Sequence, residues 1–219
     1  MRDEAAFAAP MLMPIEAARR AELERSVAAF GFAPFIDALT PAALSTLRAE
    51  ARAAHNASVL AERAPDGEAR PEGAARSYRA NLTCVGPVAR DFLTGQPVLA
   101  LLRDYFGGEH ALSEDFSCLT FYDASGHLGA HLDQPADDCA VTIIICLDAE
   151  SPDPAAPDTG LVLAVYGEEA ASVGVPRLRI PTRAGTVVLG RGSRVWHERP
   201  RLKEGESVIA ITGCYRQLR

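Results

Sequence analysis

Two residues near the middle of the chain, His131 and Asp133, could bind one metal ion together. They end the segment GHLGAHLD, and they are two residues apart. On a β-strand such residues project from the same face, whereas on a helix they would point about 200° apart. Gly126, Gly129 and Pro135 disfavour a helix here. We therefore predict a strand that presents an imidazole and a carboxylate to one ion.

A distant histidine, His197, offers a third ligand. It follows the strand-like run GTVVLG and the turn RGSR, and it leads into Glu-Arg-Pro. Two imidazoles and one carboxylate form the facial set that holds Fe(II) and leaves coordination positions open. His127 does not make a zinc-hydrolase motif with His131. On a strand the two would lie about 13 Å apart, and no Glu follows His127 as the motif HExxH requires.

The C-terminal half has the pattern of short strands. From Phe116 onward, runs rich in Val, Ile, Thr and Tyr alternate with Gly, Pro, Asp and Ser, which is typical of β-structure. No helical pattern separates these runs, so an antiparallel sandwich or barrel is favoured over parallel βαβ units. The predicted strands are 116–122, 139–147, 161–166, 177–180, 185–190, 193–197 and 206–216.

The N-terminal half has a mainly helical pattern. Thr40 is a predicted N-cap, with Pro41 at the first helical position. The 219 residues fit one domain, in which 1–115 supports a β core at 116–219. Residues 57–75 have no periodicity and are predicted to be a loop, either a lid or a surface linker. The predicted helices are 14–30, 41–55, 87–93 and 97–106, with a strand at 76–85.

Composition and charge narrow the function classes. The formal net charge is −7, and an acidic surface disfavours a nucleic-acid partner. The five cysteines are odd in number and form no CxxC, so we predict reduced thiols rather than a disulfide framework. The N-terminus lacks the pattern of a signal peptide, and no apolar run is long enough to span a bilayer. These features predict a cytoplasmic protein with no membrane partner.

Three segments together resemble a known family. YDASGHLGAHLD, the following CAVTIIICLD, and AGTVVLGRGSRVWHERP are similar to the motif-bearing strands of the 2-oxoglutarate/Fe(II)-dependent dioxygenases. The resemblance covers roughly residues 116–216. It implies an α+β fold, a double-stranded β-helix (jelly-roll, cupin-like) with supporting N-terminal helices. It also implies that His131, Asp133 and His197 hold Fe(II), and that 2-oxoglutarate and O₂ are consumed.

The sequence departs from the family at the co-substrate site. The family usually places an Arg or Lys about ten residues after the distal His, but position 207 is Ser. A buried dicarboxylate needs a cationic partner. Arg216 is our predicted partner, because its parity with Ala210 and Thr212 places it on one strand face. Tyr122 stands where the family often has a hydrogen-bond donor to 2-oxoglutarate. Three other basic residues, in a predicted loop, are disfavoured: Arg199, Arg201 and Lys203.

The resemblance implies an enzyme that oxidises an organic substrate. Related halogenases have a small residue where this chain has Asp133, so hydroxylation is favoured over halogenation. We predict a small substrate, such as an amino acid or a natural-product intermediate. Two alternatives stay open: a protein or peptide hydroxylase, and a metal-binding β-helix protein without catalysis. The sequence leaves the substrate, the outcome among hydroxylation, desaturation and cyclisation, and the oligomeric state undetermined.

Overall fold

The computed structural model describes residues 10–65, 72–153, 156 and 158–218. Twelve strands join in one antiparallel sheet with the order β1-β10-β7-β12-β5-β3-β6-β11-β8-β9, while β2 pairs with β3 and β4 with β12. The strands are β1 Phe32–Phe35, β2 Val59–Arg63, β3 Tyr78–Cys84, β4 His110–Leu112, β5 Cys118–Tyr122, β6 His127–His131, β7 Val141–Glu150, β8 Val162–Val165, β9 Leu178–Pro181, β10 Val187–Gly190, β11 His197–Arg199 and β12 Ser207–Gln217.

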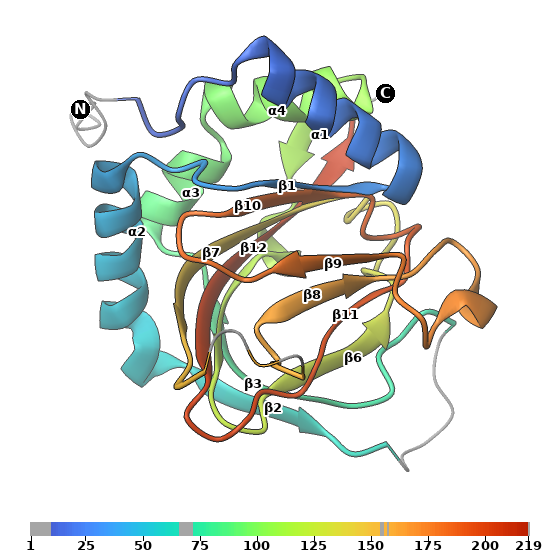
Figure 1. The fold of residues 1–219 in the computed structure, drawn as a ribbon. Coiled ribbons are helices and arrows are strands. Elements are labelled where there is room, and N and C mark those ends of the chain that lie inside the picture. The colour runs from blue at the N-terminus through green and yellow to red at the C-terminus, as the bar shows by residue number, and fades with distance from the viewer. Residues whose placement is uncertain (1–9, 66–71, 154–155, 157, 219) are drawn as a thin grey trace.

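The sheet folds back on itself into two layers. In Figure 1 the short strands β6, β11, β8 and β9 cross in front of the longer β7 and β12. Strand β3 joins the layers, since it pairs with β5 over residues 81–84 and with β6 at Tyr78 and Arg79. Two apolar clusters fill the space between the layers, one around Phe32 and Val195 and one around Leu202 and Val208. This arrangement confirms the predicted double-stranded β-helix.

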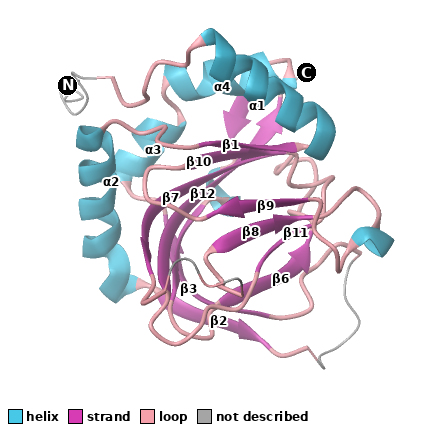
Figure 2. Cartoon of the chain, viewed as in Figure 1, coloured by secondary structure: helices cyan, strands magenta, loops and turns pink. Residues whose placement is uncertain are grey.

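Four α-helices cover the long strands from outside. They are α1 Ala17–Phe30, α2 Pro41–Ala54, α3 Pro87–Leu93 and α4 Gln96–Phe106, and three short 3₁₀ turns lie at His55–Ala57, Glu114–Phe116 and Ala170–Ser172. Figure 2 shows α1 and α4 across the top of the strands and α2 and α3 along their left side. The main apolar core lies between them, where Leu47 and Phe92 are buried with Ile143 and Ile145 of β7. The predicted helices are confirmed, and Thr40 caps α2 by accepting a hydrogen bond from the Ala43 N–H at 3.3 Å.

Two of the sequence predictions are wrong in detail. Within the predicted loop 57–75, Val59–Arg63 form β2; residues 66–71 of that loop lie outside the described part. Strand β11 begins only at His197, although the sequence predicts a strand over 193–197. The preceding residues form a turn instead, in which the backbone carbonyl of Arg191 accepts hydrogen bonds from the N–H groups of Arg194 and Val195. The structure also adds the four-residue β1, whose Pro34 suits a strand at the edge of a sheet.

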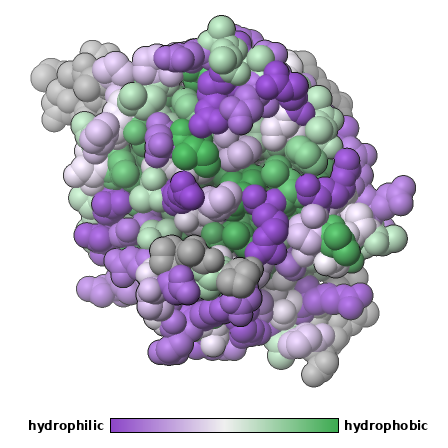
Figure 3. All heavy atoms as spheres, in the orientation of Figure 1, coloured by the Kyte–Doolittle hydropathy of each residue, from purple (hydrophilic) through white to green (hydrophobic). Residues whose placement is uncertain are grey.

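The surface is mixed in polarity. On the face shown in Figure 3, hydrophobic residues gather near the middle, over β9 and β10, and hydrophilic residues surround them. Among the described residues, no helix has both the length and the hydrophobicity to cross a bilayer.

The carboxylate of Glu50, in α2, caps the N-terminus of α3. Glu50 accepts hydrogen bonds from the N–H groups of Val88 and Ala89 at 2.8 and 2.9 Å. Glu50→Ala leaves both donors without this charged partner, so we expect the free energy of unfolding to fall by about 1–3 kcal/mol in urea denaturation. Glu22→Ala, which removes only an exposed ion pair with Arg19, is the control and should change stability less. Equal losses in the two variants would contradict the capping role.

Candidate metal centre

The structure brings the three predicted ligands together. His131 ends β6 and His197 begins β11, and the two are directly opposite each other in the β6–β11 pair. The predicted strand ends before the second ligand, because Asp133 lies two residues beyond the end of β6, where its N–H donates to the Gly192 carbonyl at 2.9 Å. One carboxylate oxygen, Oδ1, is 3.2 Å from Nε2 of His131 and 3.6 Å from Nε2 of His197. One ligand atom from each residue lies within 4.8 Å of the others, so the group could hold a metal ion.

Backbone carbonyls orient both imidazoles. Nδ1 of His131 donates to the Gly129 carbonyl and Nδ1 of His197 to the Val195 carbonyl, each at 2.9 Å. A neutral imidazole that donates through Nδ1 keeps a lone pair on Nε2. Both Nε2 atoms face Asp133, so the donor set fits a divalent metal. Outer hydrogen bonds of this kind fix the orientation of metal-binding histidines.

The Asp133 carboxylate and the two imidazoles favour each other's charged forms. Burial opposes ionisation of Asp133, but the two histidines outweigh it and hold the pKa of this carboxyl well below its usual range. Burial likewise disfavours a charged His197, yet the carboxylate raises the pKa of this imidazole above its ordinary value. Asp133 is therefore an anion in the folded chain, which is the form that binds a metal.

Neighbouring residues hold the carboxylate and one imidazole in place. The Thr142 hydroxyl donates to Oδ2 of Asp133 at 2.5 Å. A side chain at Gly192 would meet the same oxygen, since its Cβ would lie 1.8 Å from Oδ2. The Phe32 ring packs against the His197 ring with centroids 5.0 Å apart, in space that is free because residue 190 is a glycine.

A cavity runs from the three ligands into the space between the layers. Its other lining residues are Tyr122, Leu128, Thr142, Ile144, Leu163, Arg199, Ala210 and Thr212. Arg199 stands out because it is charged and only 6% exposed. Its guanidinium donates to the Thr182 hydroxyl at 2.8 Å and to the Val162 carbonyl at 3.4 Å, and it lies 5.4 Å from the centre of the Tyr122 ring.

No carboxylate among the described residues forms an ion pair with Arg199. Burial lowers the pKa of its guanidinium, but an arginine keeps its proton in proteins. The cavity therefore contains a buried positive charge that no carboxylate of the described residues contacts as an ion pair. The sequence predicts a loop at Arg199, but in the structure this residue ends β11. Its spacing of two from His197, the same as that between His131 and Asp133, was the signal that could have found it.

The structure does not bring Arg216 to this cavity. Ala210 and Thr212 line the cavity, so the predicted face of β12 does point into it. Arg216 is on the same face but lies four residues beyond Thr212, which is about 13 Å along the strand. Its side chain is exposed, beside β4, and lines a separate depression that also contains Asp137 and Arg194. The alternation of side chains along β12 identified the face that lines the cavity, but it did not show how far along β12 the cavity extends.

Tyr122, the predicted hydrogen-bond donor to 2-oxoglutarate, lies in the wall of the cavity. Burial raises the pKa of its phenol to about 12, so the hydroxyl is a neutral hydrogen-bond donor. His127 lies outside the cavity lining. Its Nδ1 lies 3.0 Å from the Ser125 carbonyl and its Nε2 lies 3.1 Å from the Ser77 hydroxyl, so it has a packing role.

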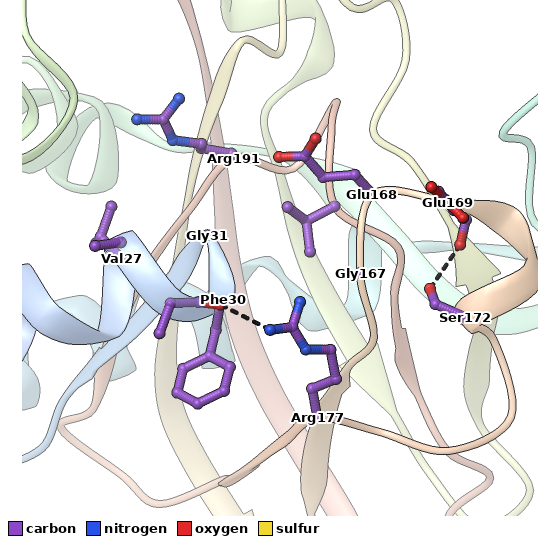
Figure 4. A pocket seen from close by; sticks show the side chains of 12 residues that line it. Val27, Phe30, Gly31, Gly167, Glu168, Glu169, Ser172, Arg177 and Arg191 are labelled. Atoms are coloured by element: carbon purple, nitrogen blue, oxygen red, sulfur yellow. Dashed lines mark hydrogen bonds between the residues drawn. The ribbon is translucent and has the colours of Figure 1, made fainter.

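A larger depression of about 600 Å³ lies elsewhere, between the C-terminal end of α1 and the segment 167–177. Figure 4 shows Arg177 reaching toward α1, where it donates to the Ala29 carbonyl at 3.2 Å. None of the metal ligands lines it. Among the described residues the His131–Asp133–His197 group is the one cluster suited to a metal, so the chemistry belongs to the smaller cavity.

Comparison with known proteins agrees with this geometry. No protein-family model and no curated protein matches the sequence. A prolyl-4-hydroxylase from Pseudomonas putida is 19% identical, with a TM-score of 0.61 over 91% of this chain and 100% of that one. A 2OG-Fe(II) family oxidoreductase from Burkholderia pseudomallei is 13% identical, with a TM-score of 0.67 over 96% and 97%.

This chain has the fold of the 2-oxoglutarate/Fe(II) oxygenases. A third solved structure with this fold is the α-ketoglutarate-dependent epimerase SnoN from nogalamycin biosynthesis, which is 14% identical, with a TM-score of 0.70 over 92% of this chain and 84% of that one. The oxygenase fold therefore spans almost the whole chain, although the sequences have diverged widely.

The hydrogen bond from Thr142 to Asp133 generates the second prediction. Thr142→Val keeps the shape of the side chain but removes the donor that orients the carboxylate. We expect Fe(II) affinity, measured by anaerobic titration, to fall about 10- to 100-fold with the fold retained.

Thr186→Val is a matched control, because the Thr186 hydroxyl is also buried but has no hydrogen-bond partner among the described residues. It should leave Fe(II) affinity unchanged. A Thr142→Val variant with wild-type affinity would show that Asp133 does not depend on this hydrogen bond.

Proposed function

We propose that this chain is an Fe(II)- and 2-oxoglutarate-dependent oxygenase that hydroxylates a small organic substrate. The observation that carries the proposal is Arg199, a buried cation that forms no ion pair with a described carboxylate and lies in the same cavity as the three candidate ligands. An uncompensated buried charge is costly. A carboxylate of a co-substrate that also reaches the metal would compensate it.

The residues of the cavity suit a diacid. Arg199 can pair with both oxygens of the distal carboxylate. The Thr182 hydroxyl already accepts from its guanidinium, and the Tyr122 ring lies 5.4 Å from it. Ser207 begins β12 and is not part of the cavity lining. The cation that the family usually places there would instead come from β11, two residues after His197.

His131, Asp133 and His197 would hold Fe(II), which supplies the activation of O₂ when it is bound. The carboxylate of Asp133 would be the third ligand that the protein gives to the metal. Related halogenases have a small residue at this position, so we propose hydroxylation rather than halogenation. Leu128, Ile144 and Leu163 form apolar walls that exclude water from the reacting groups.

The depression that contains Arg216 suits a small substrate that carries one positive and one negative charge. It is about 650 Å³, a common size for a small-molecule site, and one of its lining residues is Ser193, the neighbour of Gly192, whose carbonyl accepts from the Asp133 N–H. Two cations and two carboxylates line it and form no ion pair with one another in the described structure: Arg194, Arg216, Asp137 and Asp138. This pattern favours a zwitterion such as an amino acid.

The test is succinate release by the purified chain with Fe(II), 2-oxoglutarate and a mixture of free amino acids. We expect amino acids to stimulate release and one product to gain 16 Da, without chlorinated product in chloride buffer. His131→Ala and Asp133→Ala should abolish both Fe(II) binding and release while circular dichroism stays unchanged.

The outcomes separate the alternatives. Retained wild-type Fe(II) affinity in both variants would contradict the metal site. Stimulation by peptides but not by free amino acids would favour a peptide hydroxylase, a class to which the Pseudomonas putida protein belongs by name. Fe(II) binding without any release of succinate would favour a protein that binds metal without catalysis.

The buried cation generates a further prediction. Arg199→Gln should raise the half-saturating 2-oxoglutarate concentration about 10- to 150-fold, because a buried carboxylate without its charged partner loses about 1.5–3 kcal/mol. Fe(II) binding should persist, since Arg199 is not a ligand.

Arg216→Ala is the matched control. In succinate release measured without added amino acid it should titrate with 2-oxoglutarate like the wild type, because Arg216 is exposed and outside the cavity of the three candidate ligands. A changed titration for Arg216→Ala together with an unchanged one for Arg199→Gln would reverse the assignment and restore the partner that strand parity had predicted.

A further inference from the structure

Two buried thiols touch beside the metal centre. Sγ of Cys139 lies 2.6 Å from Sγ of Cys214, although the two residues are 75 positions apart in the chain. Their side chains are almost inaccessible, with 1% and 4% of each residue exposed. The remaining buried or half-buried thiols have oxygen neighbours instead, since Cys118 contacts the Thr120 hydroxyl and Cys146 contacts the Asp148 carbonyl, each at 3.5 Å.

Both thiols belong to segments that position the carboxylate ligand. Cys139 lies in the turn that follows Asp133, and its N–H donates to the Pro135 carbonyl at 2.9 Å. Cys214 lies in β12 directly opposite Thr142, whose hydroxyl donates to Asp133. A bond between the sulfurs would therefore tie the turn after the ligand to the strand behind it.

We propose that Cys139 and Cys214 form a reversible disulfide that fixes the turn 134–140 against β12. A disulfide has an S–S distance of about 2.0 Å, so the contacting sulfurs need only a small approach. The oxidant is a hydroperoxide. One thiol attacks hydrogen peroxide to give a sulfenic acid and water, and the second thiol displaces the hydroxyl to give the disulfide and a second water. Two thiols are oxidised and one peroxide is reduced to two waters.

The register of the strands offers one rival pairing. Cys84 and Cys118 are directly opposite each other in the β3–β5 pair. Cys84 is exposed, so it is also the thiol that peroxide reaches most easily. The experiment therefore starts from the Cys84→Ser variant of the full chain, which keeps four of the five thiols.

The folded, metal-free variant is treated with hydrogen peroxide, unfolded, and its thiols are counted. We expect the count to fall from four to two, a peptide map to link Cys139 to Cys214, and dithiothreitol to restore all four thiols. The oxidised chain should also unfold at a higher temperature than the reduced chain, because a long cross-linked loop restricts the unfolded state. Addition of Cys146→Ser as a matched control should give three thiols that fall to one.

Variants with Cys139→Ser or with Cys214→Ser added should keep all three of their thiols after the same treatment. Both are used so that a folding defect in one does not decide the result. Four thiols after oxidation, or a peptide map that links another pair, would overturn the proposal. No activity is measured, so this result is independent of the proposed oxygenase function.

Discussion

The buried carboxylate of Asp133 is the constraint on which the site depends. A carboxylate out of water is costly unless it is paired and hydrogen-bonded. Here two imidazoles face one oxygen, the Thr142 hydroxyl donates to the other, and the absence of a side chain at Gly192 leaves room for both. These partners come from β6, β7, β11 and the turn after β10. The site therefore forms only when the two layers have closed.

A second buried charge complements the first. Arg199 extends β11 past His197, so that one short strand supplies both a metal ligand and a cation to the same cavity. The cavity thus has an anionic end that suits a metal and a cationic end that suits a carboxylate. A diacid that binds the metal at one end matches this separation of charge.

The N-terminal half does more than cover the sheet. Phe32 of β1 supports the His197 ring, and the pairing of β1 with β10 places it there. Glu50 of α2 holds the start of α3, which packs with Phe92 into the core outside the long strands. Residues remote in sequence from the metal ligands thus hold the strands that present them.

The sequence by itself determined the candidate metal ligands and the class of fold. The spacing of His131 and Asp133, the glycines around them and the strand periodicity of the C-terminal half are local patterns, and local patterns are visible in a sequence. The helices were also local, since Thr40 and Pro41 mark the start of α2. Short elements such as β1 and β2 were missed, because a four- or five-residue strand that contains Pro or is largely exposed has no clear pattern of its own.

Only the tertiary structure decided which arginine faces the cavity. Arg199 and Arg216 each lie on the strand face that points toward the cavity. The alternation of side chains along a strand does not show where along that strand the cavity ends. Closure of the two layers buries Arg199 next to Tyr122 and Thr182 and leaves Arg216 beyond the cavity, at the exposed end of β12. The contact between Cys139 and Cys214 has the same origin, since residues 75 apart meet only when β7 and β12 pair. Burial and contact at long range depend on the whole fold, which no local pattern of residues contains.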